Sequence, residues 1–217
     1  MKKIKNKKKI LPKNRNQEIC IKNIIENDIN FIIGPAGTGK TLIAISSAIN
    51  FLEEFKINKI ILVKPILEVD EKLGYLPGNI LQKVDPYFKP LYDTLNYLIE
   101  AKKVQKLIEN NIIEIYPLAY MRGRNIKNSF IILDEGQNTT IKQMKMFLTR
   151  ISTNSKMVIT GDISQIDLNK NKISWLKHAM SILKEIPGIK FSFLESKDII
   201  RHKLITNIID AYEKNKQ

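Results

Sequence analysis

Short hydrophobic runs alternate with amphipathic stretches from about residue 17 onward. The hydrophobic runs, several of them closed by Gly or Pro, predict strands at residues 30–33, 59–63, 111–115, 129–133, 156–160 and 189–194. Apolar positions at helical spacing predict helices at residues 40–55, 85–100, 101–109, 139–150, 174–184 and 204–212. This alternation is typical of a mostly parallel sheet covered on both faces, so we expect a three-layer α/β/α domain. Ligands of such sheets bind at the carboxyl ends of the strands, which makes the residues after each strand the first candidates for function.

A glycine-rich segment follows the first predicted strand and precedes a predicted helix. It fits the phosphate-binding pattern G-x-x-x-x-G-K-[S/T], and its residues are Gly34, Pro35, Ala36, Gly37, Thr38, Gly39, Lys40 and Thr41. Glycines let main-chain N–H groups point at phosphate oxygens, and the N-terminus of the helix adds a favourable dipole. We expect Lys40 to reach the β- and γ-phosphates of a nucleotide, and the hydroxyl of Thr41 to bind Mg²⁺.

Two acidic residues follow the strand at 129–133. A carboxylate at the end of an apolar strand is where a P-loop protein holds Mg²⁺, and Asp134 is the candidate for that role. Glu135 beside it is suited to act as the general base that takes a proton from the attacking water. An acidic pair after a strand is also a common helix N-cap, but its occurrence together with a P-loop favours the catalytic interpretation.

A third polar segment follows the strand at 156–160 and runs from Gly161 to Gln165. We expect Gln165 to contact the γ-phosphate or the attacking water, although a Gly-Asp pair is by itself a turn signal. Gln137 is a second amide that could sense the γ-phosphate by hydrogen bonding.

Arginine is scarce in this chain, with five residues against many lysines. Arg122, Arg124 and Arg201 are candidates for neutralising the charge that develops in a phosphoryl-transfer transition state. An ordinary surface or ion-pair role is the alternative for each of them.

Charge is unevenly distributed along the chain. The 217 residues carry a net charge of +14, and eight of the first fifteen are Lys or Arg with no acidic residue among them. We therefore expect a flexible basic arm at residues 1–15 ahead of a single domain at residues 16–217. Such an arm would be attracted to the phosphates of nucleic acid, and a merely solvated arm is the alternative.

Composition excludes several classes of protein. A hydrophobic content of 43% is enough for a core and excludes wholesale disorder. The single cysteine, Cys20, excludes an internal disulfide framework and a cysteine-based zinc site, and two histidines are too few for a histidine metal cluster. No secretory signal or membrane-spanning stretch is evident, so we expect a cytoplasmic protein without a membrane partner.

The motifs GPAGTGKT, EKLGYLPG, PLAYMRGR, FIILDEGQNTT, SKMVITGD and IIRH occur in this order, and together they resemble the PhoH-like protein family over residues 17–212. That family is similar to the P-loop ATPase half of superfamily one helicases, which have an Asp-Glu-x-Gln element and a Gly-Asp-x-x-Gln element. The resemblance implies a RecA-like, helicase-like P-loop NTPase fold that binds and hydrolyses ATP with Mg²⁺ and has a link to RNA. Some members resemble partners of an endoribonuclease in ribosomal RNA maturation, which makes such a partner an expectation here.

The resemblance also changes the interpretation of Gln17. Without it this residue would be assigned to the surface, although an amide offers the donor and acceptor that suit adenine. Helicases of the related superfamily carry a glutamine upstream of the P-loop, so the resemblance implies that Gln17 reads adenine. The chain departs from the family pattern at Lys64, Val69, Asp70 and Gly136.

One ATPase lobe is present, whereas strand separation by a helicase normally needs two lobes. The resemblance therefore implies a homo-oligomer in which an arginine of one subunit, Arg201 or Arg124, completes the site of a neighbour. Two other functions stay open at this point: a nucleotide-gated binding module without turnover, and a P-loop kinase.

Overall fold

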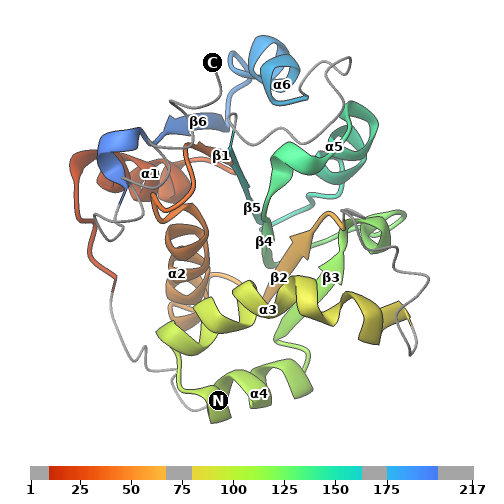
Figure 1. Ribbon diagram of the computed structural model, residues 1–217. Helices are drawn as coiled ribbons and strands as arrows, with labels where there is room; N and C mark the ends of the chain where they lie inside the picture. Colours follow the sequence, from red (N-terminus) through yellow and green to blue (C-terminus); the bar gives the residue numbers. More distant parts are fainter. Residues whose placement is uncertain (1–9, 67–79, 163–174, 200–217) are drawn as a thin grey trace, which may run out of the picture.

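A six-stranded parallel sheet forms the centre of the molecule (Figure 1). The computed structural model describes residues 10–66, 80–162 and 175–199. The strands lie in the order β3-β2-β4-β5-β1-β6. Their bounds are β1 Ile29–Ile33, β2 Lys59–Lys64, β3 Ile113–Pro117, β4 Ser129–Leu133, β5 Lys156–Gly161 and β6 Ile189–Phe193. The expected parallel sheet is confirmed, because every pair of neighbouring strands runs in the same direction.

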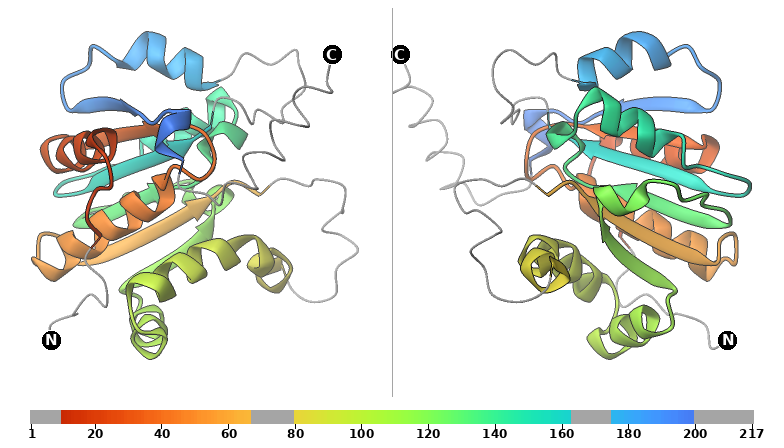
Figure 2. Two further views of the ribbon diagram at one scale, coloured as in Figure 1. Left: turned by 60° about the vertical axis from the view of Figure 1, so that its left-hand side comes forward. Right: turned by 90° about the vertical axis from the view of Figure 1, so that its right-hand side faces the viewer.

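Helices cover both faces of the sheet and produce the predicted three layers (Figure 2). One face packs against α1, α2, α3 and α4, and the other face packs against α5, α6 and the short helix η2. The helices are α1 Arg15–Glu26, α2 Lys40–Glu53, α3 Ile80–Leu98, α4 Ala101–Glu109, α5 Ile141–Leu148 and α6 Trp175–Leu183. The described residues also contain three short 3₁₀ helices: η2 Leu118–Met121, η3 Gly136–Asn138 and η4 Ser196–Asp198.

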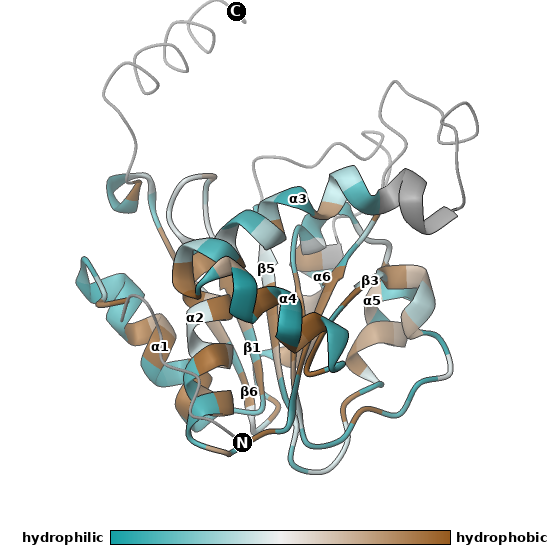
Figure 3. Ribbon diagram, turned by 90° about the horizontal axis from the view of Figure 1, so that it is seen from below, coloured by the Kyte–Doolittle hydropathy of each residue, from teal (hydrophilic) through white to brown (hydrophobic). Residues whose placement is uncertain are grey.

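Strand β4 shows why the strands read as continuous hydrophobic runs. Phe130 and Ile132 join the core on the α2 face, while Ile131 and Leu133 join the core on the α5 face. Alternate side chains of a strand point to opposite faces, and both faces are covered here. In Figure 3 the strands are mostly hydrophobic, whereas much of the outer surface of α3 and α4 is hydrophilic.

Two helices begin at different residues from those predicted. Helix α5 begins at Ile141 rather than at 139, because Thr140 caps it. Thr140 Oγ1 accepts a hydrogen bond from the main-chain nitrogen of Gln143 at 3.2 Å, and Gln143 Oε1 accepts one from the main-chain nitrogen of Thr140 at 2.8 Å. Helix α3 begins at Ile80, ahead of the expected start at 85, and contains both Pro86 and Pro90.

Residues 10–15, which were expected to belong to a basic arm, contact the domain. Ile10 packs against the core on the α2 face, the main-chain nitrogen of Lys13 donates to Gln17, and Arg15 is the first residue of α1. Residues 1–9 and the predicted helix at 204–212 lie outside the described residues. In the part of the chain that the structure describes, no helix is both long enough and apolar enough to cross a bilayer.

The central strands deliver the polar segments of interest to one edge of the sheet. β5 lies between β1 and β4, so the carboxyl ends of these three strands are neighbours. The chain leaves β1 at Gly34, β4 at Asp134 and β5 at Asp162.

Candidate nucleotide-binding site

The glycine-rich loop closes tightly between β1 and α2. Gly37 and Gly39 both have φ of +86°, a left-handed conformation that suits glycine and strains other residues. The hydroxyl of the fully buried Thr38 donates to the carbonyl of Pro35 at 2.9 Å and thereby holds the loop in its turn. Gly39 is the N-cap of α2, so the loop ends at the helix N-terminus, where an anion is favoured.

Lys40 is the first residue of α2, and its side chain folds back over this loop. Its ammonium group donates to the carbonyl oxygens of Gly34 at 2.6 Å and Pro35 at 2.7 Å. The residue is half-buried and lines the cavity described below. A cation is thus positioned at the loop in which phosphates were expected.

Asp134 is fixed by two hydroxyl groups from different elements. One of its carboxylate oxygens, Oδ1, accepts from Thr41 Oγ1 at 2.6 Å and from Thr160 Oγ1 at 2.7 Å. Asp134 is 5% exposed, and its main-chain nitrogen donates to the carbonyl of Val63 on β2. The carboxylate therefore ties the start of α2 to the end of β5.

Thr41 and Asp134 are suitable ligands for Mg²⁺. Mg²⁺ prefers oxygen donors and commonly binds through one or two protein groups with phosphates and water completing its shell. The hydroxyl and the carboxylate touch each other at the wall of the cavity, which is the arrangement that the sequence predicted for the metal. The residues present therefore fit the ion.

Glu135 occupies a constrained position beside Asp134. Its backbone is left-handed, with φ of 56° and ψ of 40°, a conformation that costs a non-glycine residue roughly 1–2 kcal/mol. Its carboxylate accepts a hydrogen bond from Nε2 of the buried Gln137. Oε1 of Gln137 accepts from the main-chain nitrogen of Asp162 at 3.1 Å. One amide thus connects the loop after β4 with the loop after β5.

These groups surround a cavity of about 290 Å³ at the carboxyl edge of the sheet. Its wall includes the P-loop, Asp134, Glu135 and Gln137, and also Thr94 of α3. Sequence reasoning did not find Thr94 or Thr160. Thr160 carried a usable signal, because it is the last polar side chain of a buried strand next to β4; Thr94 carried none, because only tertiary packing brings α3 to the cavity.

A second hollow of about 580 Å³ adjoins the P-loop on the side of α1. Ile10, Leu42 and Tyr97 are among its lining residues, together with Gln17. Nε2 of Gln17 donates to the carbonyl of Thr38 at 3.1 Å, and its Oε1 accepts from the Lys13 nitrogen at 2.9 Å. Gln17 is 4% exposed, so it lies inside the domain rather than on the surface.

The remaining predicted residues lie apart from this cavity or outside the described structure. Gln165 and Arg201 fall outside the described residues, so their catalytic roles stay predictions. Arg124 lies over strand β3 and forms an ion pair with Glu114 of the same chain at 3.0 Å. Arg122 is exposed in the loop that follows η2.

A glycine loop on a helix N-terminus, a lysine over that loop and a hydroxyl–carboxylate pair beside it define a P-loop nucleotide-binding protein. The chain belongs to the PhoH-like protein family, whose pattern matches residues 9–213.

Relatives and solved structures can be compared directly with this chain. It is 50% identical to the PhoH-like protein of Bacillus subtilis (strain 168) over 207 residues. This alignment covers 95% of this chain and 65% of that relative. It is 48% identical to the PhoH-like protein of Mycobacterium tuberculosis (strain ATCC 25618 / H37Rv) over 205 residues, and this second alignment covers 94% of this chain and 58% of that relative. The chain thus spans less than two thirds of the length of these relatives. The Sulfolobus solfataricus SWI2/SNF2 ATPase core in complex with dsDNA aligns with 71% of this chain and 34% of that chain, at 15% identity and a TM-score of 0.44.

Proposed function

We propose that this protein hydrolyses ATP with Mg²⁺ and couples hydrolysis to the binding of RNA. The proposal of ATP hydrolysis is supported mainly by the different surroundings of two adjacent carboxylates, Asp134 and Glu135. Asp134 is buried and held by two hydroxyls, which suits a metal ligand. Glu135 lines the cavity and is oriented by an amide, which suits a base that must reach a water molecule.

ATP binding would exchange the present contacts of Lys40 for contacts with phosphate. The ammonium group already lies at the loop, bound to two neutral carbonyls. Phosphate oxygens are stronger acceptors for a cation, and the N-terminus of α2 favours them as well. Mg²⁺ held by Thr41 and Asp134 would neutralise part of the charge on the phosphates.

The chemical step needs one proton acceptor from the protein. Glu135 accepts a proton from water while the water oxygen forms a bond to the γ-phosphorus. The bond between the γ-phosphorus and the oxygen bridging to the β-phosphate breaks, and ADP and inorganic phosphate are released. Gln137 orients Glu135 through the hydrogen bond that the two side chains share.

The hollow beside Gln17 is the proposed place for the adenine ring. It is lined mainly by apolar side chains and by Tyr97, and it opens directly next to Gly37 and Gly39 of the P-loop. An amide has two N–H donors and two acceptor lone pairs, so Gln17 retains one of each beyond its two contacts with the chain. The remaining donor and acceptor of Gln17 match the acceptor and donor on the edge of adenine.

RNA is proposed as the coupled ligand because the chain is strongly basic, with a net charge of +14. An endoribonuclease partner and a homo-oligomer are proposed on the family resemblance, since a single lobe would need a neighbour to enclose a strand. An arginine completing the neighbour's site would come from Arg201 rather than from Arg124, which is already bound to Glu114.

The decisive experiment measures phosphate release and ATP binding by the same protein preparations, with and without single-stranded RNA. Glu135→Gln should lower turnover by about 10²–10⁴-fold and leave ATP affinity within a few fold, because only the proton acceptor is lost. Glu18→Gln, a substitution of an exposed glutamate on α1, is the matched control.

Full turnover in Glu135→Gln would show that another group is the base. Wild-type protein that binds Mg²⁺-ATP but never hydrolyses it, even with RNA, would indicate the nucleotide-gated module instead. Transfer of the γ-phosphate to a small-molecule hydroxyl would indicate a kinase.

A further inference from the structure

An exposed aromatic surface lies at the end of strand β3, away from the nucleotide cavity. The rings of Tyr116 and Tyr120 are nearly parallel, with an angle of 10° between them and 6.5 Å between their centroids. The guanidinium carbon of Arg124 lies 4.7 Å from the centroid of the Tyr116 ring. Tyr120 is 45% exposed. These three residues and Arg122 are called the Tyr120 surface below.

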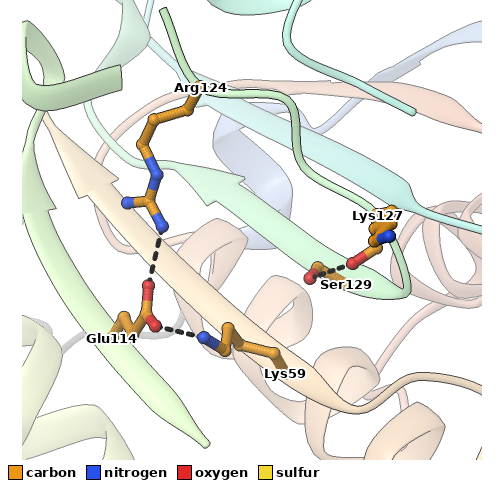
Figure 4. Close-up of polar contacts among 5 residues, drawn as sticks. All are labelled: Lys59, Glu114, Arg124, Lys127 and Ser129. Atoms are coloured by element: carbon orange, nitrogen blue, oxygen red, sulfur yellow. Dashed lines mark hydrogen bonds and ion pairs between the residues drawn. The ribbon is translucent and has the colours of Figure 1, made fainter. Parts of the chain in front are cut away.

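The surface is held in place from beneath by a buried carboxylate. Glu114 of β3 is 8% exposed and lies between Lys59 of β2 and Arg124, both of which donate to it (Figure 4). Burial opposes ionisation of Glu114, but hydrogen bonds from Lys59 and Arg124 outweigh it and hold the pKa of this carboxyl below its ordinary value of 4.5. The main-chain oxygen of Arg124 also accepts from the Arg150 guanidinium at 3.2 Å. Arg124 is therefore held against the Tyr116 ring, on which the Tyr120 ring stacks.

The segment of sequence that contains Tyr120, Arg122 and Arg124 is predominantly basic, which favours a polyanion as ligand. Residues 117–155 contain two acidic side chains, Asp134 and Glu135, and both of these line the nucleotide cavity. The same stretch contains six basic residues: Arg122, Arg124, Lys127, Lys142, Lys145 and Arg150. Within the described ranges Arg122 is exposed and takes part in no ion pair, so its guanidinium is available to a phosphate.

The position of this surface connects it to the nucleotide site. Helix η2 follows the carboxyl end of β3, so Tyr120 belongs to the same edge of the sheet as the P-loop. One strand, β2, separates β3 from β4, the strand that leads into Asp134 and Glu135. Two strand spacings correspond to about 10 Å, which is short enough for a bound strand to influence the loop after β4.

We propose that the Tyr120 surface is a contact site for single-stranded RNA, in which Tyr120 stacks on an unpaired base and Arg122 binds a neighbouring phosphate. This inference rests on the RNA coupling proposed above and assigns the place on the protein where the RNA binds. Aromatic side chains bind unpaired bases without regard to sequence, because every base has a π-face, and a basic surface tracks the backbone. A duplex would not offer its base faces to Tyr120.

The test measures binding of a fluorescently labelled 12-nucleotide single-stranded RNA to the full chain by anisotropy. Tyr120→Ala should weaken binding about tenfold, whereas Tyr120→Phe should bind within twofold of wild type because the ring is retained. Arg122→Ala should weaken binding and reduce the slope of log affinity against log salt by about one unit. Lys22→Ala removes an exposed cation of α1 and should have less effect on affinity than Arg122→Ala.

Wild-type binding that is unaffected by both Tyr120→Ala and Arg122→Ala would overturn this location and leave RNA coupling intact. A wild-type chain that binds no RNA would overturn the coupling and this inference together. Equal losses in Tyr120→Phe and Tyr120→Ala would show that the phenol hydroxyl, not stacking, makes the contact. Thermal unfolding of each variant verifies that the loss is not one of folding.

Discussion

Two lysines at opposite edges of the same sheet make nearly identical bonds and have opposite electrostatic surroundings. Lys40 donates to the carbonyls of Gly34 and Pro35 at 2.6 and 2.7 Å. Lys156, the first residue of β5, donates to the carbonyls of Ile25 and Asn27 at 3.2 and 2.6 Å. The carbonyls at Lys156 belong to the C-terminal end of α1, where the helix dipole favours a cation. Lys40 stands at the N-terminus of α2, where the dipole favours an anion.

The two lysines bind carbonyls in the same way and differ in their surroundings. Only Lys40 lies where a helix dipole favours the binding of an anion. At the amino edge the ammonium of Lys156 completes a helix terminus and lies 5.4 Å from the centre of the Phe51 ring. Burial lowers the pKa of Lys156, and nearby Asp28 offsets part of this effect. At the carboxyl edge Lys40 lies at a helix N-terminus, and both the cation and the helix dipole attract the phosphates of a nucleotide.

Cavity size does not reveal this difference. The hollow at the amino edge, beside Lys156, measures about 920 Å³, whereas the cavity beside Lys40 measures about 290 Å³. The smaller one contains the carboxylate pair and the P-loop. Chemistry, not volume, therefore identifies the nucleotide site.

Replacing Lys40 should produce the largest effect. Lys40→Ala removes the cation at the loop, so we expect turnover to fall by at least about 100-fold and ATP affinity to fall with it. The free energy of unfolding in the absence of nucleotide should change by less than about 1 kcal/mol, because the two lost hydrogen bonds are offset by removing a cation from the N-terminus of α2. Isothermal titration with ATP, phosphate release and urea unfolding measure the three quantities. Full ATP affinity in Lys40→Ala would contradict the P-loop assignment.

Replacing Lys156 should reverse that pattern. Lys156→Met keeps the length of the side chain and removes two hydrogen bonds at the end of α1, so we expect the free energy of unfolding to fall by about 2 kcal/mol. The burial of the charge, which opposes ionisation, keeps the loss from being larger. ATP affinity should stay within twofold of wild type. A stable Lys156→Met variant with weakened ATP binding would mean that the amino edge also serves the nucleotide.

The sequence was sufficient for those parts of the structure that depend on local pattern. The alternating runs predicted each described strand within about two residues, and the Mg²⁺ roles predicted for Thr41 and Asp134 agree with the contact between these two side chains. Their spacing is local, or follows from the rule that carboxyl ends of parallel strands share an edge.

Side chains whose roles depend on packing could not be predicted. Lys156 begins a strand and resembles a surface lysine in sequence, because its partners on α1 are 129 and 131 residues away. Arg124 was a candidate for the active site, yet Glu114 and Tyr116 hold it over β3. Helix α3 was expected to begin at residue 85, next to Pro86. A proline leaves one helical carbonyl without its main-chain donor, but both prolines of α3 are exposed, so such a carbonyl can accept a hydrogen bond from another group. The hydroxyl of Thr94 also donates to the Pro90 carbonyl at 2.8 Å, one turn back along α3.

The smallest expected effect concerns the other end of β5, where Thr160 binds the carboxylate of Asp134. Thr160→Val has a similar shape and removes one of two hydroxyls that fix Oδ1, while Thr41 keeps its own bond at 2.6 Å. Loss of one such hydrogen bond costs about 1 kcal/mol, so we expect the Mg²⁺ concentration for half-maximal turnover to rise about fivefold. Thr153→Val, the same change at an exposed residue just before β5, is the control and should leave the Mg²⁺ requirement unchanged. A metal titration of phosphate release decides the matter: if Thr160→Val and Thr153→Val behave alike, the hydroxyl of Thr160 only fills the core, and the orientation of Asp134 depends on Thr41.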